Sequence, residues 1–530
     1  MRSRQHVQNG RNAARGLAGA LLCAALAAAH AEGAAGPYSG RSFESVHAGT
    51  FNGERLEYEA TFADVLVTDD EGKETASIFA TSYVRTDVED AGERPVIFLW
   101  NGGPTAASQP LHMAGFGPRR LIIPEVGEPV GPPWAVRHNP ATLLDVADLV
   151  FVDPVETGYS RMLPAADRAW LFSVDGDAES FAAFIRAWLA ASGREASPAY
   201  VLGTSYGSIR AVLVASRLAG SSTPLAGAIL FSQGVNLVET TQRQNNIVGY
   251  ASNMSQQAAI AWYHGRTAHQ DKSVSEVIDM AERFAMDDYL VALAQGRRLP
   301  DDARKALAMR LEGLTGVAAA RWLESDLRMT KPAFRRELLQ DEGRVLGAND
   351  ARYTAAADAE EGPVNPTAGV SAVHREHMAA FLGVDLPPDE YRPFAPAAFA
   401  EWGWGGTSTL DGSPAPPGAL RTVFADFDYP GALLPAFEAR EDFRIFIATG
   451  IYDTLTTVGP ARLLAAHPAY PEARVALEEY PGGHAFYADD DAFVRLADDL
   501  RAFLRGHEAR FSGSATPSGS PGTATPRRAR

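Results

Sequence analysis

The sequence predicts an α/β fold in which a mainly parallel sheet is flanked by helices. Short, nearly unbroken apolar runs, typical of strands buried on both faces, lie at residues 96–100, 149–152, 200–202, 228–231 and 445–448. Between several of these runs, apolar residues recur at helical spacing, as from Phe181 to Leu189 and from Phe493 to Leu504. Strands that alternate with helices indicate parallel pairing with right-handed crossovers.

The chain of 530 residues divides into parts by pattern. We expect the first part of the sheet domain over residues 32–241, starting with an antiparallel hairpin of residues 56–67 and 75–84. Residues 242–400 break the alternation with long helical segments, for example 274–295 and 301–324, and are predicted to form a helical lid or insertion. The sheet domain resumes at 401–510. Residues 511–530, rich in Ser, Gly, Thr and Pro, are predicted to be disordered.

The first 31 residues have the pattern of a cleaved signal peptide. Four arginines precede an apolar run at 16–29, and Ala29-His30-Ala31 fits a cleavage site. The run is too short to span a bilayer comfortably, and Leu22 makes Cys23 a poor lipid attachment site. We therefore expect a periplasmic or secreted protein without stable membrane association. Because Cys23 is the only cysteine, the mature protein would contain no disulfide.

Composition narrows the class of partner. A hydrophobic content of 46% is sufficient for a large core, so the chain is globular. The net charge of −17 and the lack of a long Lys/Arg run argue against nucleic acid as a partner. The oligomeric state is not indicated by the sequence.

The stretch from Ala199 to Ala215 supplies a candidate nucleophile. A buried strand, the turn Gly203-Thr204-Ser205-Tyr206-Gly207 and a helix follow one another, which is the setting that G-x-S-x-G requires. The glycines allow a sharp corner that exposes the Ser205 hydroxyl at the sheet edge. Alone, this pentapeptide also fits an ordinary strand-to-helix turn.

A serine nucleophile requires a histidine base and a carboxylate to orient it. Asp453 follows the strand at 444–448, and His484 follows the strand at 475–480. Both would lie at the carboxyl edge of the sheet, together with Ser205. Either residue alone has an ordinary structural explanation, such as a helix cap for Asp453. The order Ser, Asp, His after successive strands favours a catalytic triad.

The oxyanion of an acyl-transfer intermediate requires two backbone N–H donors. The predicted donors are Tyr206, directly after the nucleophile, and Gly103 in the turn Asn101-Gly102-Gly103-Pro104. A tight turn without a catalytic role is the alternative for the second donor.

The sequence resembles the serine carboxypeptidases in five ordered motifs. Trp100 to Pro104 is similar to their W-L-N-G-G-P, Gly115 to Pro118 to E-x-G-P, and Val152 to Ser160 to D-Q-P-V-G-T-G-F-S. Gly203 to Gly207 is similar to G-E-S-Y-A-G, and the segments at Asp453 and His484 to G-x-x-D and G-G-H. The resemblance extends from about Phe43 to Leu504 and is weakest across the lid.

The resemblance implies an α/β-hydrolase fold with Ser205 as nucleophile, His484 as base and Asp453 as its orienting carboxylate. It also implies an oxyanion hole of Gly103 and Tyr206 and binding of a peptide's terminal carboxylate by Asn101, with Gly102 and the residue at position 204 beside it. Members of the family that act at acid pH hold that carboxylate with two glutamic acids. Here Thr204 and Gly115 take those positions.

Other residues have less specific signals. Arg119 or Arg120 could replace the lost carboxylate clamp, although paired arginines are usually solvated. His374, Glu376 and His377 could share a helix face toward a metal, but a solvated lid helix is the simpler interpretation. Trp402 and Trp404 could wall an apolar subsite or pack as ordinary aromatics.

These observations predict an exported serine-type carboxypeptidase that works through an acyl-enzyme on Ser205. An esterase or acyltransferase remains the alternative, and a non-catalytic binding protein on the same scaffold is disfavoured by the complete triad. The predicted partner is a peptide or a small acyl ester. We expect neither a cofactor nor a bound metal.

Overall fold

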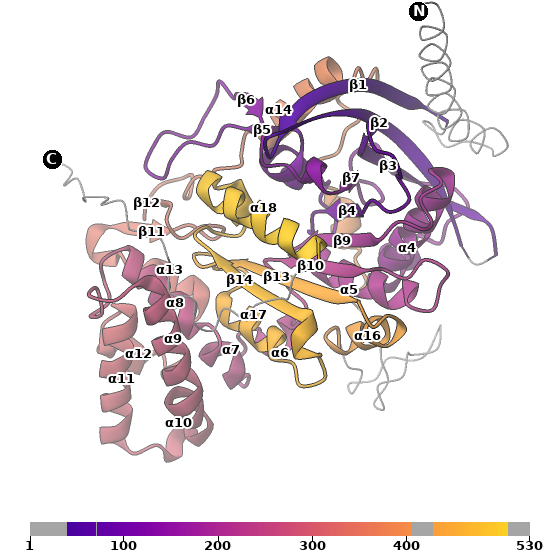
Figure 1. Cartoon of the computed structure of the whole chain (residues 1–530). Coiled ribbons are helices and arrows are strands. Elements are labelled where there is room, and N and C mark those ends of the chain that lie inside the picture. Colours follow the sequence, from indigo (N-terminus) through magenta and orange to yellow (C-terminus); the bar gives the residue numbers. More distant parts are fainter. Residues whose placement is uncertain (1–39, 70, 405–427, 507–530) are drawn as a thin grey trace, which may run out of the picture.

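The computed structural model describes residues 40–69, 71–404 and 428–506 (Figure 1). The expected signal peptide at 1–31 and the expected disordered tail at 511–530 lie outside these residues. Within them, no helix combines the length and the apolar composition that crossing a membrane requires.

In the described ranges, a central sheet of ten strands organises the structure. The order is β1-β2-β3-β7-β4-β9-β10-β13-β14, with β8 paired to β3. Pairing is antiparallel from β1 to β7 and parallel from β7 to β14. The strands are β1 (Ser42–Phe51), β2 (Glu54–Thr68), β3 (Glu74–Arg85), β4 (Val96–Trp100), β7 (Asp148–Val152), β8 (Arg161–Met162), β9 (Ala199–Thr204), β10 (Gly227–Phe231), β13 (Arg444–Gly450) and β14 (Val475–Tyr480).

The predicted α/β class and the hairpin of β2 and β3 are confirmed, whereas β1 was not predicted. Side chains of β1 alternate between exposed and partly buried, and only Phe51 at its end is fully buried. An edge strand of this kind lacks the continuous apolar run that marks the central strands.

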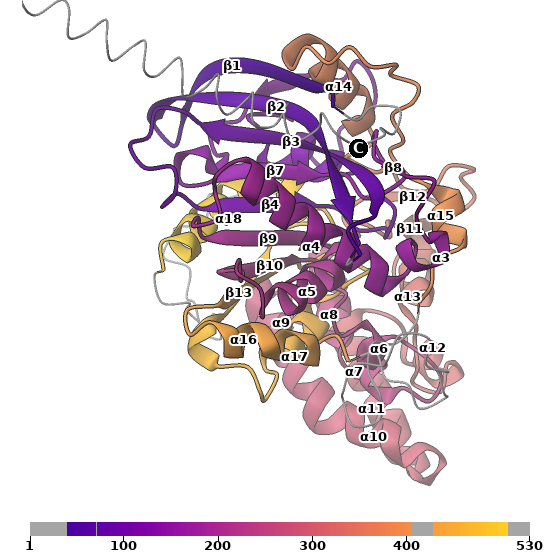
Figure 2. The same cartoon turned by 90° about the vertical axis from the view of Figure 1, so that its right-hand side faces the viewer.

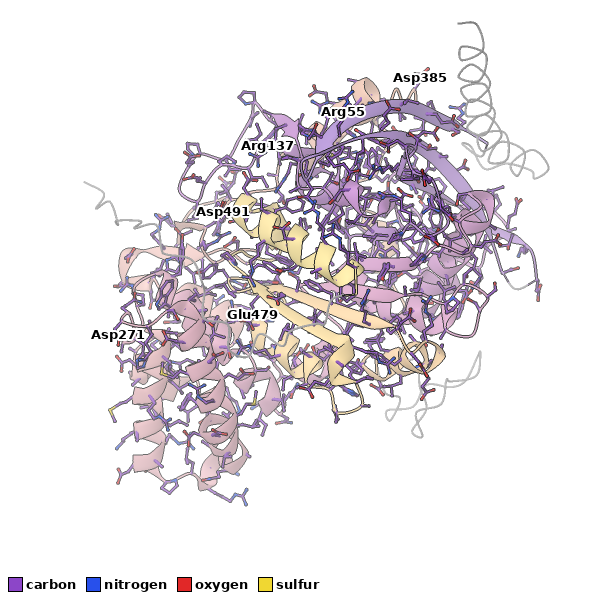
Figure 3. All side chains as sticks on the ribbon, in the orientation of Figure 1. Arg55, Arg137, Asp271, Asp385, Glu479 and Asp491 are labelled. Atoms are coloured by element: carbon purple, nitrogen blue, oxygen red, sulfur yellow. The ribbon has the colours of Figure 1, made fainter. Side chains whose placement is uncertain are left out.

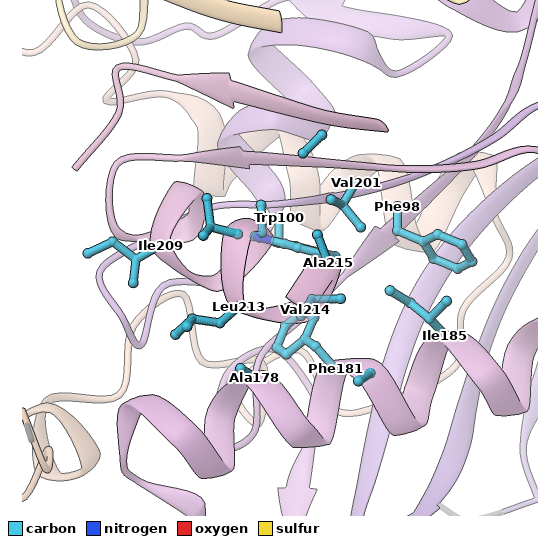
Figure 4. Packing of buried hydrophobic residues seen from close by; sticks show 14 of the residues in the cluster. Phe98, Trp100, Ala178, Phe181, Ile185, Val201, Ile209, Leu213, Val214 and Ala215 are labelled. Atoms are coloured by element: carbon cyan, nitrogen blue, oxygen red, sulfur yellow. The ribbon is translucent and has the colours of Figure 1, made fainter. Parts of the chain in front are cut away.

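Helices cover both faces of the sheet. Side chains alternate between the two faces along each central strand, and because those of β4 and β7 are all buried, both faces pack against helices. On one face, Phe98 and Trp100 pack against α4 (Val174–Ala191) and α5 (Tyr206–Leu218), as Figure 4 shows. On the other face, Ile97 and Leu99 join a cluster with α18 (Asp490–Leu504). Figures 1 and 2 show the sheet between these helical layers.

The predicted insertion contains a helical unit with its own apolar core, which includes Leu311 and Trp322. In both views this unit extends to one side of the sheet (Figures 1 and 2). Its helices are α7 (Ile247–Ala251), α8 (Met254–Tyr263), α9 (Val274–Phe284), α10 (Leu290–Gln295), α11 (Asp301–Thr315), α12 (Ala319–Glu324) and α13 (Lys331–Glu337).

The insertion differs in two ways from a simple run of long helices. The segment expected to be continuous at 301–324 is broken at Gly316, whose φ of +70° is left-handed and whose Cβ would lie 2.6 Å from the carbonyl oxygen of Arg266. Further along, α14 (Val370–Glu376) packs in the cluster on the face of the sheet, not in the core of the helical unit. The boundaries at residues 242 and 400 stay predictions.

A buried ion network ties the amino end of the central sheet together. The Asp148 carboxylate, at the start of β7, is fully buried and accepts from Arg94 Nε at 2.7 Å and Arg194 Nη1 at 2.5 Å. The same arginines also donate to backbone carbonyls, among them Leu144 and Arg94. Removal of the carboxylate would leave two buried guanidinium charges without a counter-ion.

We therefore expect Asp148→Ala to lower the free energy of unfolding by about 3–5 kcal/mol, the range for breaking a buried pair. Asp288→Ala is the matched control, because this aspartate pairs with Arg310 at 2.8 Å but is 49% exposed. It should change the free energy of unfolding by about 1 kcal/mol or less. Urea denaturation of both variants measures the difference, and equal losses would contradict this account.

Candidate active site

Ser205 occupies a strained turn between β9 and α5. Its φ is +58° and its ψ is −127°, values that a residue with a Cβ adopts only when the surrounding structure holds it. The turn is tight enough that a Cβ on Gly203 would lie 1.9 Å from the carbonyl oxygen of Gly207. Position 203 is therefore restricted to glycine. A Cβ on Gly207 would lie 2.9 Å from the Trp100 ring and 3.0 Å from the Asn101 oxygen, so this position also favours glycine.

Asp453 and His484 form a hydrogen-bonded pair at the carboxyl ends of β13 and β14. His484 Nδ1 lies 2.7 Å from Asp453 Oδ2, and Asp453 is fully buried. The carboxylate also accepts from the Leu455 N–H at 2.7 Å and from the Thr456 hydroxyl at 2.7 Å. These bonds hold a negative charge against Nδ1 and direct Nε2 away from the carboxylate.

The end of β10 connects the nucleophile with the base. The Ser205 N–H donates to the Phe231 carbonyl at 3.0 Å, and the Ser232 hydroxyl donates to the His484 carbonyl at 2.9 Å. Two consecutive residues thus hold the Ser205 turn and the His484 loop. Among the described residues, the Ser205 hydroxyl makes no hydrogen bond. The structure therefore shows no direct bond from Ser205 to His484, and transfer of the serine proton to His484 is part of the proposed mechanism.

The helical insertion supports the Asp453 and His484 loops from outside the sheet. The Asn349 carbonyl accepts from the His484 N–H at 2.5 Å, and the Ala348 carbonyl accepts from the Thr454 hydroxyl at 2.6 Å. A Cβ on Gly483 would lie 2.2 Å from the Asn349 oxygen, so this approach requires the glycine before the histidine. These carbonyl contacts could not be predicted from residue types, because every residue has a main-chain carbonyl.

Two backbone amides in the predicted oxyanion hole are free to bind a ligand. Neither the Gly103 N–H nor the Tyr206 N–H donates to an acceptor in the described part of the chain. The turn that carries Gly103 touches the nucleophile turn, because a Cβ on Gly102 would lie 2.7 Å from both the Thr204 oxygen and the Tyr206 nitrogen. This arrangement offers two donors to a developing oxyanion.

Arg210 holds the oxyanion turn in place. Its fully buried guanidinium donates to the carbonyls of Asn101 and Pro104 at 2.9 and 2.8 Å and pairs with Asp177 at 2.8 Å. Sequence reasoning missed this residue, although an arginine on the buried face of the apolar helix after Ser205 is a signal that could have identified it.

Asn101, predicted to bind a substrate carboxylate, lies at the same turn and is buried. Its Oδ1 accepts from the Leu111 N–H at 3.1 Å, and its Nδ2 lies 3.5 Å from the Tyr487 hydroxyl. The carbonyl side of the amide is thus committed to the fold, while Nδ2 has one long contact.

A comparison with protein families indicates which class of enzyme this site belongs to. The serine carboxypeptidase family model matches residues 70–282, which include the oxyanion turn and the Ser205 turn. Residues 70–282 are therefore similar to the serine carboxypeptidase family. The chain is therefore a serine hydrolase, and its strand order and helical layers are those of an α/β-hydrolase fold. A comparison with curated protein sequences finds no match.

The solved structures that the comparison finds are distant in sequence. The prohormone-processing carboxypeptidase Kex1 from Saccharomyces cerevisiae is 11% identical, with 85% of this chain and 91% of Kex1 covered and a TM-score of 0.43. Proline iminopeptidase from Mycobacterium smegmatis is 13% identical, with coverages of 84% and 98% and a TM-score of 0.34. A haloalkane dehalogenase variant from Bradyrhizobium elkanii is 13% identical, with coverages of 87% and 98% and a TM-score of 0.32.

The two positions that lack the glutamic acids of the serine carboxypeptidases are filled differently. At Gly115, a Cβ would meet the Tyr487 ring at 3.2 Å, so this ring occupies the space of a side chain. The Thr204 hydroxyl is buried and has no hydrogen-bond partner within the described residues. Neither position supplies a carboxylic acid that could share a proton with a substrate carboxylate.

The suggestion that Arg120 replaces the clamp does not fit its contacts, and the suggestion for Arg119 stays a prediction. Arg120 is 3% exposed, donates to the carbonyls of Ala114 and Ala488 at 3.1 and 2.9 Å, and stacks over Phe493. Its guanidinium is already occupied by the fold. Arg119 lies 5.4 Å over the Phe381 ring.

The expected solvated helix at His374 and His377 is wrong, because both histidines are buried. The Tyr83 hydroxyl lies 2.7 Å from His112 Nε2 and 2.8 Å from His377 Nε2. Burial lowers the pKa of His374 to about 3, so its ring is neutral. Glu376 is exposed. In the described ranges, no group of three or more His, Cys, Asp and Glu side chains is arranged to hold a metal.

Trp402 and Trp404 lie beside the residue that follows the nucleophile. Both present ring edges to Tyr206, with centroids at 5.6 and 5.7 Å. Trp402 is buried, as ordinary packing predicts, whereas Trp404 is 47% exposed. The exposed ring offers an apolar surface next to Tyr206, the residue that follows Ser205.

The pH dependence of hydrolysis follows from His484. Burial lowers its pKa, but the charge and hydrogen bond of Asp453 outweigh burial, and the net pKa lies above the ordinary value of about 6.5. Only the neutral imidazole can accept the serine proton. We expect kcat/KM to rise with pH through that raised pKa and to level above it. A kcat/KM profile from pH 4 to 9 with a neutral ester measures this, and a maximum near pH 4 to 5 would contradict it.

Proposed function

We propose that the chain is an exported serine-type carboxypeptidase that hydrolyses C-terminal peptide bonds through an acyl-enzyme on Ser205. The Asp453–His484 hydrogen bond, at the sheet edge that carries the Ser205 turn, is the observation that carries the proposal. The similarity of residues 70–282 to the serine carboxypeptidase family supports the peptide substrate. The arginines and the apolar run of the first 31 residues support export.

In the proposed mechanism, Ser205 Oγ attacks the scissile carbonyl carbon and its proton passes to His484 Nε2. Asp453 stabilises the imidazolium, and the N–H groups of Gly103 and Tyr206 bind the oxyanion. His484 then gives the proton to the leaving amine as the C–N bond breaks. A water molecule, deprotonated by His484, attacks the acyl carbon, and Ser205 recovers its proton as the ester bond breaks.

An esterase or acyltransferase is the second candidate, and one observation favours it. The positions of the family's carboxylate-binding glutamic acids are Thr204 and Gly115, and the Tyr487 ring fills the space at Gly115. The same triad would accept any activated acyl group, and its action on peptides would then depend on another carboxylate-binding group.

Ser205 is tested by covalent labelling. A fluorophosphonate probe should label the wild-type protein, and Ser205→Ala should abolish labelling because the attacking oxygen is gone. Ser216→Ala, on the last turn of the same helix, is the control and should be labelled like the wild type. Labelling that survives in Ser205→Ala would disprove the assignment. Labelling of separated cell fractions from the native host tests export.

Peptidase and esterase are separated by matched substrates. We expect a blocked dipeptide with a free C-terminus to be hydrolysed with a higher kcat/KM than the same dipeptide carrying a C-terminal amide, since a carboxypeptidase binds the terminal carboxylate. A blocked amino-acid ester serves as the positive control for the triad. Hydrolysis of the ester together with no cleavage of either dipeptide would favour the second candidate.

A further inference from the structure

Lys331, the first residue of α13 in the helical insertion, contacts the loop that carries Asp453. Its Nζ donates to the Leu455 carbonyl at 2.5 Å. The N–H of the same Leu455 donates to Asp453 Oδ1 at 2.7 Å. The ammonium is therefore bound two residues from the carboxylate of the triad, and Figure 1 shows α13 beside the ends of β13 and β14.

The charge of Lys331 has no carboxylate partner. An ammonium carries three N–H donors. Within the described residues, one acceptor, the Leu455 carbonyl, binds Nζ. Among the described residues, Lys331 forms no ion pair with a carboxylate within 4.0 Å. The Asp453 carboxylate attracts the Lys331 ammonium electrostatically. Its oxygens, however, already accept hydrogen bonds from Leu455, Thr456 and His484.

A second cation lies on the same face of the helix. Arg335, one turn further, donates from Nη1 to the Thr454 hydroxyl at 2.8 Å and also has no carboxylate within ion-pair distance in the described ranges. Like charges four residues apart on a helix repel each other. Burial lowers the pKa of Lys331, and Arg335 lowers it further, while Asp453 opposes both. A partly buried pair of unneutralised cations costs stability unless an anion binds to it.

Several other candidates for a carboxylate-binding group are absent or already occupied, whereas Asn101 Nδ2 has one long contact, at 3.5 Å to the Tyr487 hydroxyl, and stays a candidate. The family's two glutamic acids are absent, and the Arg120 guanidinium is occupied by backbone carbonyls. Arg119 lies over Phe381. Lys331, by contrast, lies close enough to the triad to interact electrostatically with both Asp453 and His484.

We propose that Lys331 binds a carboxylate of the substrate. The inference rests on the proposed function, because it requires a substrate that is hydrolysed at Ser205. A peptide offers this chemistry from two sources, its terminal carboxylate and the side chain of an acidic residue next to the scissile bond. Arg335 adds positive potential at the same face.

The test compares Lys331→Met and Lys331→Gln with the wild type. Glutamine keeps an N–H donor for the Leu455 carbonyl and removes the charge, so it separates the charge from support of the loop. Four blocked dipeptides are used, with a free or amidated C-terminus and with Glu or Gln before the scissile bond, together with a neutral ester. The readout is the ratio of kcat/KM between each anionic substrate and its neutral counterpart.

We expect both variants to lower that ratio about tenfold or more, as the loss of a charge-assisted hydrogen bond predicts. A fall for free-acid over amidated dipeptides identifies the terminal carboxylate, and a fall for Glu over Gln identifies the side chain. Arg336→Met, which removes an exposed charge from the same helix, is the control and should leave the ratio unchanged.

Two outcomes would overturn the proposal. An unchanged ratio in both variants means that Lys331 does not bind a substrate carboxylate. An equal fall of kcat/KM for all substrates, including the neutral ester, means that Lys331 supports the Asp453 loop instead. Fluorophosphonate labelling of the wild type keeps these outcomes distinct from a failure of the proposed function, in which Ser205 itself is not labelled.

Discussion

The contact between two backbone turns is the constraint on which the site depends. The Asn101–Pro104 turn after β4 and the Ser205 turn after β9 approach so closely that a Cβ on Gly102 would lie 2.7 Å from backbone atoms of the other turn. Parallel pairing of β4 with β9 brings the turns together, and the buried Arg210 guanidinium fixes the carbonyls of the first turn. The turns that carry the two free amides are therefore held in close contact with each other.

Structural features that depend on local sequence were predicted correctly. The central strands, the hairpin of β2 and β3, and the positions of Ser205, Asp453 and His484 at one sheet edge followed from apolar runs and from glycine-rich turns. Those features are local in the sequence. The β1 strand was not predicted because its side chains alternate between exposed and partly buried. The helix break at Gly316 was missed because one glycine within a helical pattern is an ambiguous signal.

Contacts between distant residues could not be predicted in the same way. The packing of the Tyr487 ring at Gly115, the support of the His484 loop by the Asn349 carbonyl and the burial of Arg120 depend on where loops meet in space. Paired arginines look alike in sequence whether they are solvated or buried. Each of these contacts changes the interpretation of a residue whose type alone suggested a role.

The helical insertion is part of the framework that holds the Asp453 loop. Ile451 and Tyr452, next to Asp453, belong to its apolar core, so the carboxylate loop is packed from the insertion side. Arg462 joins Glu479 of β14, labelled in Figure 3, to Asp279 of α9 at 2.8 Å. Because these contacts are numerous and partly buried, a rigid-body movement of the helical unit would also disturb Asp453.

The loss of the two glutamic acids changes how charge is distributed around the triad. Burial raises the pKa of Tyr487 to about 12, so the groups beside Asn101 are a neutral phenol and a neutral amide. Lys331 carries positive charge close to His484, and that charge lowers the pKa of the imidazole. A carboxylate bound at Lys331 would cancel this effect and make His484 a stronger base. Binding of an anionic substrate would thus promote proton removal from Ser205 in the same step.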